Sequence, residues 1–194
     1  MSEHPKYRRN SKREDLIKAG IAEINAHGIA GFSIRSVAAA CGVSCAAPAK
    51  HFGNRNGFLA AIIEYVNSQW RERQLCIIEE HKDSIKDQII GLSVAYVQFL
   101  VENPHFRSIL MLKDDEFDNT YHKLRGEMTS ITQKLVDEYC KSVNMDDDVR
   151  ARKLYVVRSL IFGAALMFDN GEMEYSEKTM EYVRTSIARE FELA

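Results

Sequence analysis

Apolar residues recur along this chain at the three- and four-residue spacing of amphipathic helices. The clearest stripe, in residues 176–191, joins Met180, Val183, Ile187 and Phe191. Long alternating runs of β-branched residues, which would indicate strands, are missing. The pattern therefore predicts an all-α fold. Its expected helices span 11–27, 58–81, 84–103, 104–113, 121–143, 149–170 and 176–191.

Cap residues mark the ends of several of these helices. Asp83 or Ser84 precedes the helix that Pro104 stops, and Gly171 follows residue 170. The acids at 146–148 lie where negative charge favours a helix N-terminus, so we assign them a capping role rather than a catalytic one. The acidic stretch 113–118 is expected to be a solvated loop, because nothing fixes its carboxylates for metal binding.

The stretch 149–170 is the most apolar of the expected helices. Twelve of the fifteen residues from Leu154 to Phe168 are apolar, on all sides, so we expect the most buried helix, covered by more than its own domain. Two such helices, 149–170 and 176–191, from each of two protomers would form a four-helix homodimer interface; the alternative is packing within one chain. Fifteen residues that include Arg158 are too few to span a bilayer, so no membrane partner is expected.

Residues 33–59 carry the spacing of a helix-turn-helix. Ser33 or Ser36 can cap a first short helix, whose inner face would hold Val37, Ala38 and Cys41. Gly42 permits the positive φ of a sharp turn. Ser44 would then cap a second helix running through His51, with Pro48 in its first turn.

Residues 16 to about 62 resemble the N-terminal DNA-binding domain of TetR-type transcriptional repressors. The resemblance rests on an amphipathic helix that ends in Gly28, on the helix-turn-helix and on the closing pair His51-Phe52. The first helix matches at Leu16, Ile17, Ala19, Ile21 and Ile24, and the helix-turn-helix at Val37, Ala38, Gly42, Val43 and Ser44. Two positions depart from the family pattern: Ala49 replaces an aromatic residue, and Arg55 replaces a lysine while keeping its charge. Residues 95–111 resemble the family's regulatory domain more weakly.

The resemblance implies three parts and a set of DNA contacts. The parts are a flexible basic arm at 1–12, a three-helix DNA-binding domain at 13–57 and a helical ligand-binding and dimerisation domain at 58–194, with Gly57 and the Gly53-Asn54 pair as a hinge. The arm either lies on DNA or is a disordered tail. Phosphate contacts are expected from Ser33, Arg35, Ser36, Lys50, His51 and Arg55, and contacts to base edges from Ser44, Cys45, Ala46 and Ala47.

Charge is distributed unevenly along the chain. Residues 1–56 carry nine Lys or Arg and four acids, a net charge of +5, whereas the remainder carries −7. No acid occurs between Glu23 and Glu64. An acid-free window of 40 residues across a helix-turn-helix favours a phosphate-binding surface over an ordinary solvated face.

The regulatory half supplies aromatic and flexible apolar side chains for a small hydrophobic or amphipathic effector. The candidates are Trp70, Tyr96, Phe99, Phe106, Met111, Tyr121, Met128, Arg158 and Phe162. Each apolar candidate is also compatible with an ordinary core position. Arg158, inside an apolar helix, either pairs with a carboxylate of a neighbouring helix or anchors an anionic effector. By the resemblance, the effector releases a homodimeric repressor from a palindromic DNA operator.

Other function classes find little support in the sequence. The motifs of metalloproteases, serine hydrolases and phosphate-binding loops are absent, so an enzyme is not expected, and neither is a cofactor. The four cysteines lack metal-ligand spacing and are expected to be reduced thiols, with redox sensing by Cys45 as the alternative. No signal peptide is apparent and a cytoplasmic location is expected. A helical adaptor without DNA binding stays open as a further alternative, encouraged by Ala49.

Overall fold

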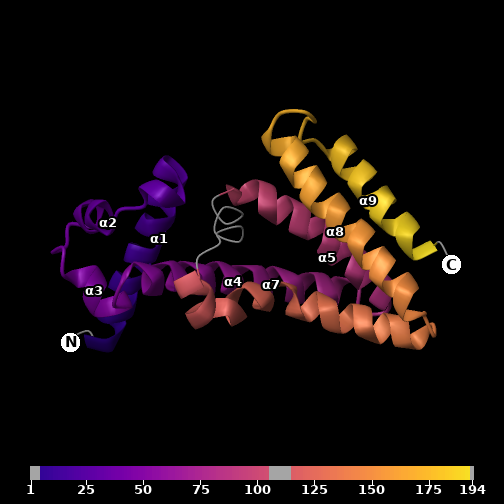
Figure 1. Ribbon diagram of the computed structural model, residues 1–194, viewed down its shortest axis with the longest axis horizontal. Helices are drawn as coiled ribbons and strands as arrows, with labels where there is room; N and C mark the ends of the chain where they lie inside the picture. Colours follow the sequence, from indigo (N-terminus) through magenta and orange to yellow (C-terminus); the bar gives the residue numbers. More distant parts are fainter. Residues whose placement is uncertain (1–4, 105–114, 193–194) are drawn as a thin grey trace. The chain divides into compact units, whose positions relative to one another are not determined.

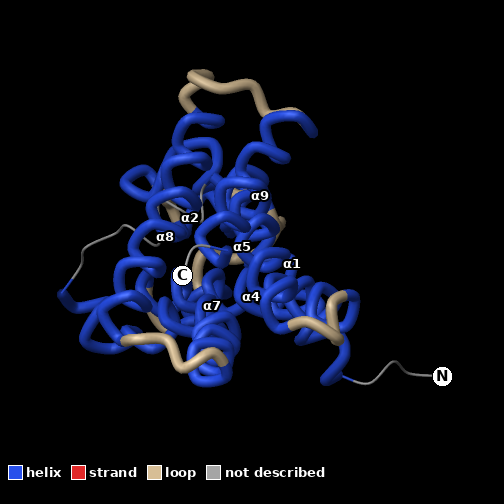
Figure 2. Tube along the Cα trace, turned by 90° about the vertical axis from the view of Figure 1, so that its right-hand side faces the viewer, coloured by secondary structure: helices blue, strands red, loops and turns tan. Residues whose placement is uncertain are grey.

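The structure is a computed structural model that describes residues 5–104 and 115–192 (Figure 1). Within these ranges all regular secondary structure is helical, which confirms the all-α prediction, and short loops join the helices (Figure 2). The helices are α1 (Pro5–Gly31), α2 (Ile34–Ala40), α3 (Ala47–Phe52), α4 (Arg55–Glu80), α5 (Ile85–Glu102), α7 (Asp115–Ser142), α8 (Asp147–Asp169) and α9 (Glu177–Glu192). None of these described helices combines the length and apolar character needed to cross a bilayer.

The chain divides into two compact units. The N-terminal unit comprises residues 1–68 and 105–126, and the C-terminal unit comprises 69–104 and 127–194. The division falls inside α4 and α7, so each of these helices contributes residues to both units.

The core of the N-terminal unit joins α1, α2 and α4. Leu16, Ile17 and Ile24 of α1 are buried, as the helical spacing of the sequence predicts. Gly20 lets α1 and α4 approach closely: a Cβ there would lie 3.0 Å from Ile62 Cδ1. The remaining core residues of this unit include Phe32, Val37, Ala38, Phe58, Leu59 and Ile63.

Helix α5 is central to the C-terminal unit. Twelve of its 18 residues are buried, and it packs against both α8 and α9, which also pack against each other. The expectation that 149–170 is the most buried helix is therefore wrong for the single chain. Helix α8 leaves Tyr155 73% exposed and Leu166 51% exposed, because only one of its faces meets α5 and α9.

Most predicted helix caps are confirmed. The Asp87 N–H donates to Ser84 Oγ at 3.2 Å at the start of α5, and the Asp148 N–H donates to Asp146 Oδ1 at 2.9 Å at the start of α8. Gly171 has a φ of 70° and follows the end of α8. The predicted stripe of α9 is buried at Met180, Val183 and Ile187 and half-buried at Phe191.

Three predicted boundaries are wrong. Helix α1 begins at Pro5 rather than at residue 11, so most of the stretch expected as an arm is helical backbone. Helix α7 begins at Asp115, so residues 115–118 are helical rather than a loop; acids there suit a helix N-terminus. Gly57 lies inside α4 rather than before it. The short helix predicted at 104–113 falls almost wholly outside the described residues.

Candidate functional site

Helix α2 starts at a side-chain cap. Ser33 has extended backbone angles, and its Oγ accepts a hydrogen bond from the Ser36 N–H at 3.3 Å. Of the two caps that the sequence allows, the structure selects Ser33. Its hydroxyl thus stabilises the helix end, and the exposed Arg35 and Ser36 follow it in the first turn.

Removal of this cap should destabilise the N-terminal unit. We expect Ser33→Ala to lower the free energy of unfolding by about 1 kcal/mol, the usual cost of losing a serine cap. Ser36→Ala is the matched control, because the Ser36 contact comes from its backbone N–H, and it should stay within about 0.5 kcal/mol of the native protein. Urea unfolding followed by circular dichroism measures both, and equal stability of the two variants would contradict the assignment.

The turn after α2 has the geometry that the sequence predicts. Gly42 has a φ of 62°, and its N–H donates to Ala39 O at 3.0 Å while the Val43 N–H donates to Ala38 O at 3.0 Å. This pair of bonds is a Schellman motif, in which a left-handed glycine closes the helix. Ala38 is fully buried, so α2 can approach its neighbours closely.

The start of α3 differs from the prediction. Ser44 does not cap this helix: the Ala47 N–H donates to the Ser44 backbone carbonyl at 2.9 Å, and the helix begins at Ala47 after Ala46, which makes no side-chain cap bond. The buried Pro48 at the second helical position explains the shift, since proline favours the first turn, where no N–H is required. Residues 44–46 therefore form an exposed turn ahead of α3.

Aromatic stacking holds the end of α3 against α4. The Phe52 and Phe58 rings are stacked, with centroids 4.1 Å apart, and Phe32 meets Phe58 edge-on at 5.5 Å. The Arg13 guanidinium lies 5.5 Å from the Phe52 ring centroid and pairs with Glu64 at 3.6 Å. This stack fixes the second helix of the motif to the first residues of α4.

Arg55 is held by the protein itself. Its Nη2 donates to the Ile29 carbonyl oxygen at 2.6 Å, and its guanidinium lies 5.8 Å from the Phe32 ring centroid. The sequence had suggested a phosphate contact at this position. The geometry adds a bracing role between α4 and the end of α1, which sequence reasoning missed because a backbone carbonyl acceptor has no sequence signature.

The other proposed DNA contacts occupy exposed or half-buried positions of α2, the turn and α3. Arg35, Ser36, Ser44, Cys45, Ala46 and Lys50 are exposed, whereas Ser33, Ala47, His51 and Arg55 are half-buried. This edge therefore presents two cations and a row of small side chains, with no acid between residues 24 and 63. Small side chains allow close approach to a DNA groove, and cations attract phosphate.

The two thiols of this unit lie in different environments. Burial raises the pKa of the Cys41 thiol, which also donates to the Asp15 carbonyl oxygen at 3.7 Å, and Cys45 is exposed in the turn before α3. Among the described residues, no group of three or more His, Cys, Asp or Glu side chains is arranged to hold a metal ion.

The C-terminal unit gathers four of the predicted effector residues into one aromatic cluster. Trp70 lies 5.3 Å from Tyr96 and 5.0 Å from Phe99 between ring centroids, and Phe162 meets Tyr96 at 6.4 Å. The Trp70 Nε1–H donates to the Met128 carbonyl oxygen at 3.0 Å, and Trp70 is only 2% exposed. Trp70 is thus a core residue, as is the buried Met128.

Tyr96 lies between this core and a charged side chain. Burial raises the pKa of Tyr96 to about 12, and the nearby positive charge of Arg158 opposes that rise. Arg158 is therefore close enough for its charge to act on the cluster.

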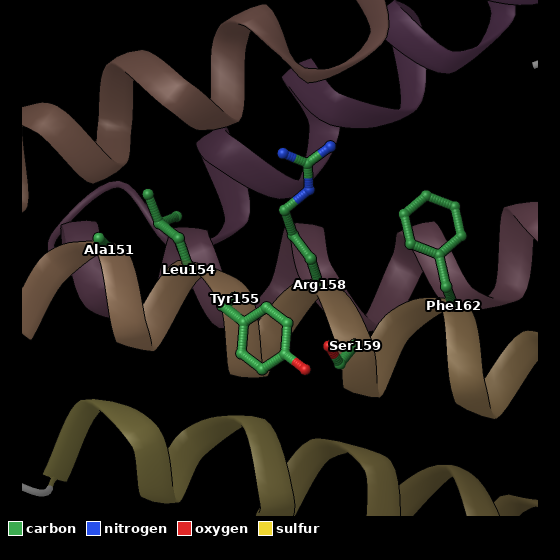
Figure 3. A pocket seen from close by; sticks show the side chains of 6 residues that line it. All are labelled: Ala151, Leu154, Tyr155, Arg158, Ser159 and Phe162. Atoms are coloured by element: carbon green, nitrogen blue, oxygen red, sulfur yellow. The ribbon is translucent and has the colours of Figure 1, made fainter.

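An open hollow of about 530 Å³ lies along α8 (Figure 3). Arg158, Leu154 and Phe162 point to one side of the helix, whereas Tyr155 and Ser159 point to the other. We call it the α8 hollow; its lining residues are Ala151, Leu154, Tyr155, Arg158, Ser159 and Phe162. From Ala151 the other lining residues follow at three, four, seven, eight and eleven positions, a helical spacing, but only Arg158 and Phe162 are predicted from the sequence.

The predicted ion pair of Arg158 is not formed by the described residues. The ion pairs among them join other partners, including Arg150 of α8 with Asp137 of α7. Arg158 is exposed instead. Phe106 and Met111 lie outside the described residues, and so does the Tyr121 side chain.

A helix-turn-helix with a basic, acid-free edge, carried by a chain with a helical body, defines a DNA-binding regulator. Residues 16–62 match the family of bacterial regulatory proteins called tetR, which confirms the resemblance and its extent. The match covers residues 16–62 of the 194-residue chain, so the likeness to these bacterial regulatory proteins is shown for that part of the chain.

Solved structures extend the likeness to the whole fold. A TetR-family transcription regulator from Marinobacter aquaeolei VT8 is 16% identical, with a TM-score of 0.71 over 95% of this chain and 97% of its own. A protein of unknown function from Rhodococcus sp. RHA1 is 20% identical, with a TM-score of 0.73 over 93% of both chains. FadR from Bacillus subtilis, solved with stearoyl-CoA, is 12% identical, with a TM-score of 0.71 over 91% of this chain and 95% of its own. No curated protein sequence matches the chain.

Proposed function

We propose that this chain is a homodimeric, cytoplasmic repressor that binds a palindromic operator and is released by a small hydrophobic or amphipathic effector. The exposed edge of residues 33–50 carries the DNA-binding part of the proposal. Its small side chains suit close contact with base edges, and Arg35 and Lys50 suit phosphate.

Exposed apolar side chains on α8 and α9 support the homodimer. Leu166, Met167 and Tyr182 are large, exposed side chains on two helices that pack together. Aromatic residues and methionine are enriched at the centres of protein interfaces. A second copy of the chain that covers these residues by two-fold symmetry would complete a four-helix interface.

The effector part of the proposal is supported by the α8 hollow and the aromatic cluster beside it. A volume of about 530 Å³ lies within the range of small-molecule sites. FadR, a structural neighbour, was solved with stearoyl-CoA, which is amphipathic. An effector of this kind releases DNA if it binds more tightly to the released conformation than to the DNA-bound one.

A gel-shift titration tests the DNA-binding part. The full-length protein should bind the DNA upstream of its own gene, with an affinity that falls steeply as salt increases. Lys50→Ala should weaken binding and reduce the salt slope by about 1, the loss of one phosphate contact. Lys134→Ala, which removes an exposed lysine of α7, is the control and should change neither. Equal effects of the two substitutions on DNA binding would contradict the assignment of residues 33–50 as the DNA-binding surface.

A further inference from the structure

The α8 hollow combines an apolar wall with an arginine that forms no ion pair with a described carboxylate. Arg158, Leu154 and Phe162 point to the same side of α8 (Figure 3). The Phe162 ring contacts the Tyr96 ring, with centroids 6.4 Å apart. The Tyr96 ring in turn contacts Trp70, with centroids 5.3 Å apart. A cation and an apolar path into an aromatic cluster thus lie side by side.

Two other cations of α8 have partners within the protein, whereas Arg152 is exposed and does not line the hollow. Arg150 pairs with Asp137, and the Lys153 Nζ donates to the Glu190 carbonyl oxygen. Arg158 forms no ion pair with any described carboxylate, although its charge reaches Tyr96. A guanidinium beside apolar surface retains two parallel donors that fit a carboxylate or a phosphate group.

We propose that the α8 hollow binds an anionic amphiphile, with its carboxylate or phosphate group on Arg158 and its apolar chain along Leu154 and Phe162 towards Tyr96. The proposal rests on the effector-responsive function and names the chemical class of the effector. A neutral lipid leaves Arg158 without a charged partner, and a cationic amphiphile is repelled by it. An anion without an apolar chain gains nothing from the aromatic wall.

Binding of matched twelve-carbon probes to the full-length protein tests the proposal. Dodecanoate, dodecyl phosphate, dodecanol and dodecyltrimethylammonium are titrated below their micelle concentrations, by calorimetry and by fluorescence of Trp70, the only tryptophan of the chain. Dodecanoate, dodecyl phosphate or both should bind about 10- to 100-fold more tightly than dodecanol, the gain expected from charge-assisted hydrogen bonds. The two anionic probes distinguish a carboxylate effector from a phosphate effector.

Two variants separate the role of Arg158 from general charge. Arg158→Gln should reduce anion affinity to that of dodecanol, whereas Arg152→Gln, at an exposed position of α8 that does not line the hollow, should leave it unchanged. Arg158→Lys should recover part of the affinity, because lysine keeps the charge but loses the paired donors. Equal binding of dodecanoate and dodecanol by the native protein, preference for the cationic probe, or equal losses in the two glutamine variants would overturn the proposal.

Gel shifts on the same protein keep this test apart from that of the proposed function. Arg158→Gln should bind operator DNA as the native protein does, while the anionic probes lose their power to release it. A protein that binds DNA but shows no preference for anionic probes would overturn only the effector class. A protein that prefers anionic probes but binds no DNA would overturn the regulator and leave the α8 hollow as an anion-binding site.

Discussion

Gly57→Ala is expected to disrupt the N-terminal unit and abolish DNA binding. Gly57 lies in the first turn of α4, where its N–H donates to Asn54 Oδ1 at 2.8 Å. A Cβ at this position would lie 2.0 Å from the Phe52 carbonyl oxygen. Because the obstacle is backbone, no rotamer change relieves it, and the Phe52–Phe58 stack must shift. We expect a loss of about 3 kcal/mol in the free energy of unfolding, the upper end of overpacking costs.

Gly126→Ala is the matched control for this prediction. Among the described residues, no atom lies within 4 Å of a Cβ added at Gly126, which is inside α7. Alanine favours a helix over glycine, so this variant should be unchanged or more stable by up to about 1 kcal/mol. Urea unfolding and gel shifts measure both variants. If the Gly57→Ala variant kept the stability and the DNA affinity of the native protein, the predicted clash with the Phe52 carbonyl oxygen would be wrong.

Leu166→Glu is expected to convert the homodimer to a monomer and to weaken operator binding by about 10²- to 10⁴-fold. Leu166 is 51% exposed on α8 in the single chain, and a two-fold interface would place the new charge in it twice. The loss of affinity follows because a monomer engages one half-site instead of two linked ones. Analytical ultracentrifugation at micromolar concentration and gel shifts on the operator measure the two effects.

Leu75→Glu provides the control for the dimer prediction. Leu75 is 56% exposed on α4, outside the two helices assigned to the interface. The Leu75→Glu variant introduces the same charge at a similarly exposed leucine. It should leave both the mass of the assembly in solution and its affinity for DNA unchanged. A monomeric native protein, or a Leu166→Glu variant that stays dimeric, would contradict the assignment of α8 and α9.

Local signals in the sequence predicted local structure well. Ser33, Ser84 and Asp146 cap helices because each satisfies a backbone N–H within three residues, an interaction that spacing alone indicates. Gly42 closes α2 because only glycine adopts a φ of 62° without strain. The buried stripe of α9 likewise follows from its helical period.

Features set by distant contacts or by competing local signals escaped prediction. Ser44 looked like a cap, but Pro48 moved the start of α3 to Ala47. Arg55 appeared free for phosphate, whereas the fold places the Ile29 carbonyl within its reach, 26 residues away. The ion pair expected for Arg158 failed because a single sequence does not show which helix face meets which neighbour.

Selection of DNA from a random pool by the full-length native protein tests the central claim most directly. The account predicts enrichment of a palindromic motif, with half-sites about 34–36 Å apart or a multiple of that distance, since two identical recognition helices read a two-fold symmetric site. The Lys50→Ala variant should recover the same motif less efficiently. Failure to enrich any sequence would contradict an operator-binding regulator, and enrichment of a single unrepeated half-site would contradict the homodimer.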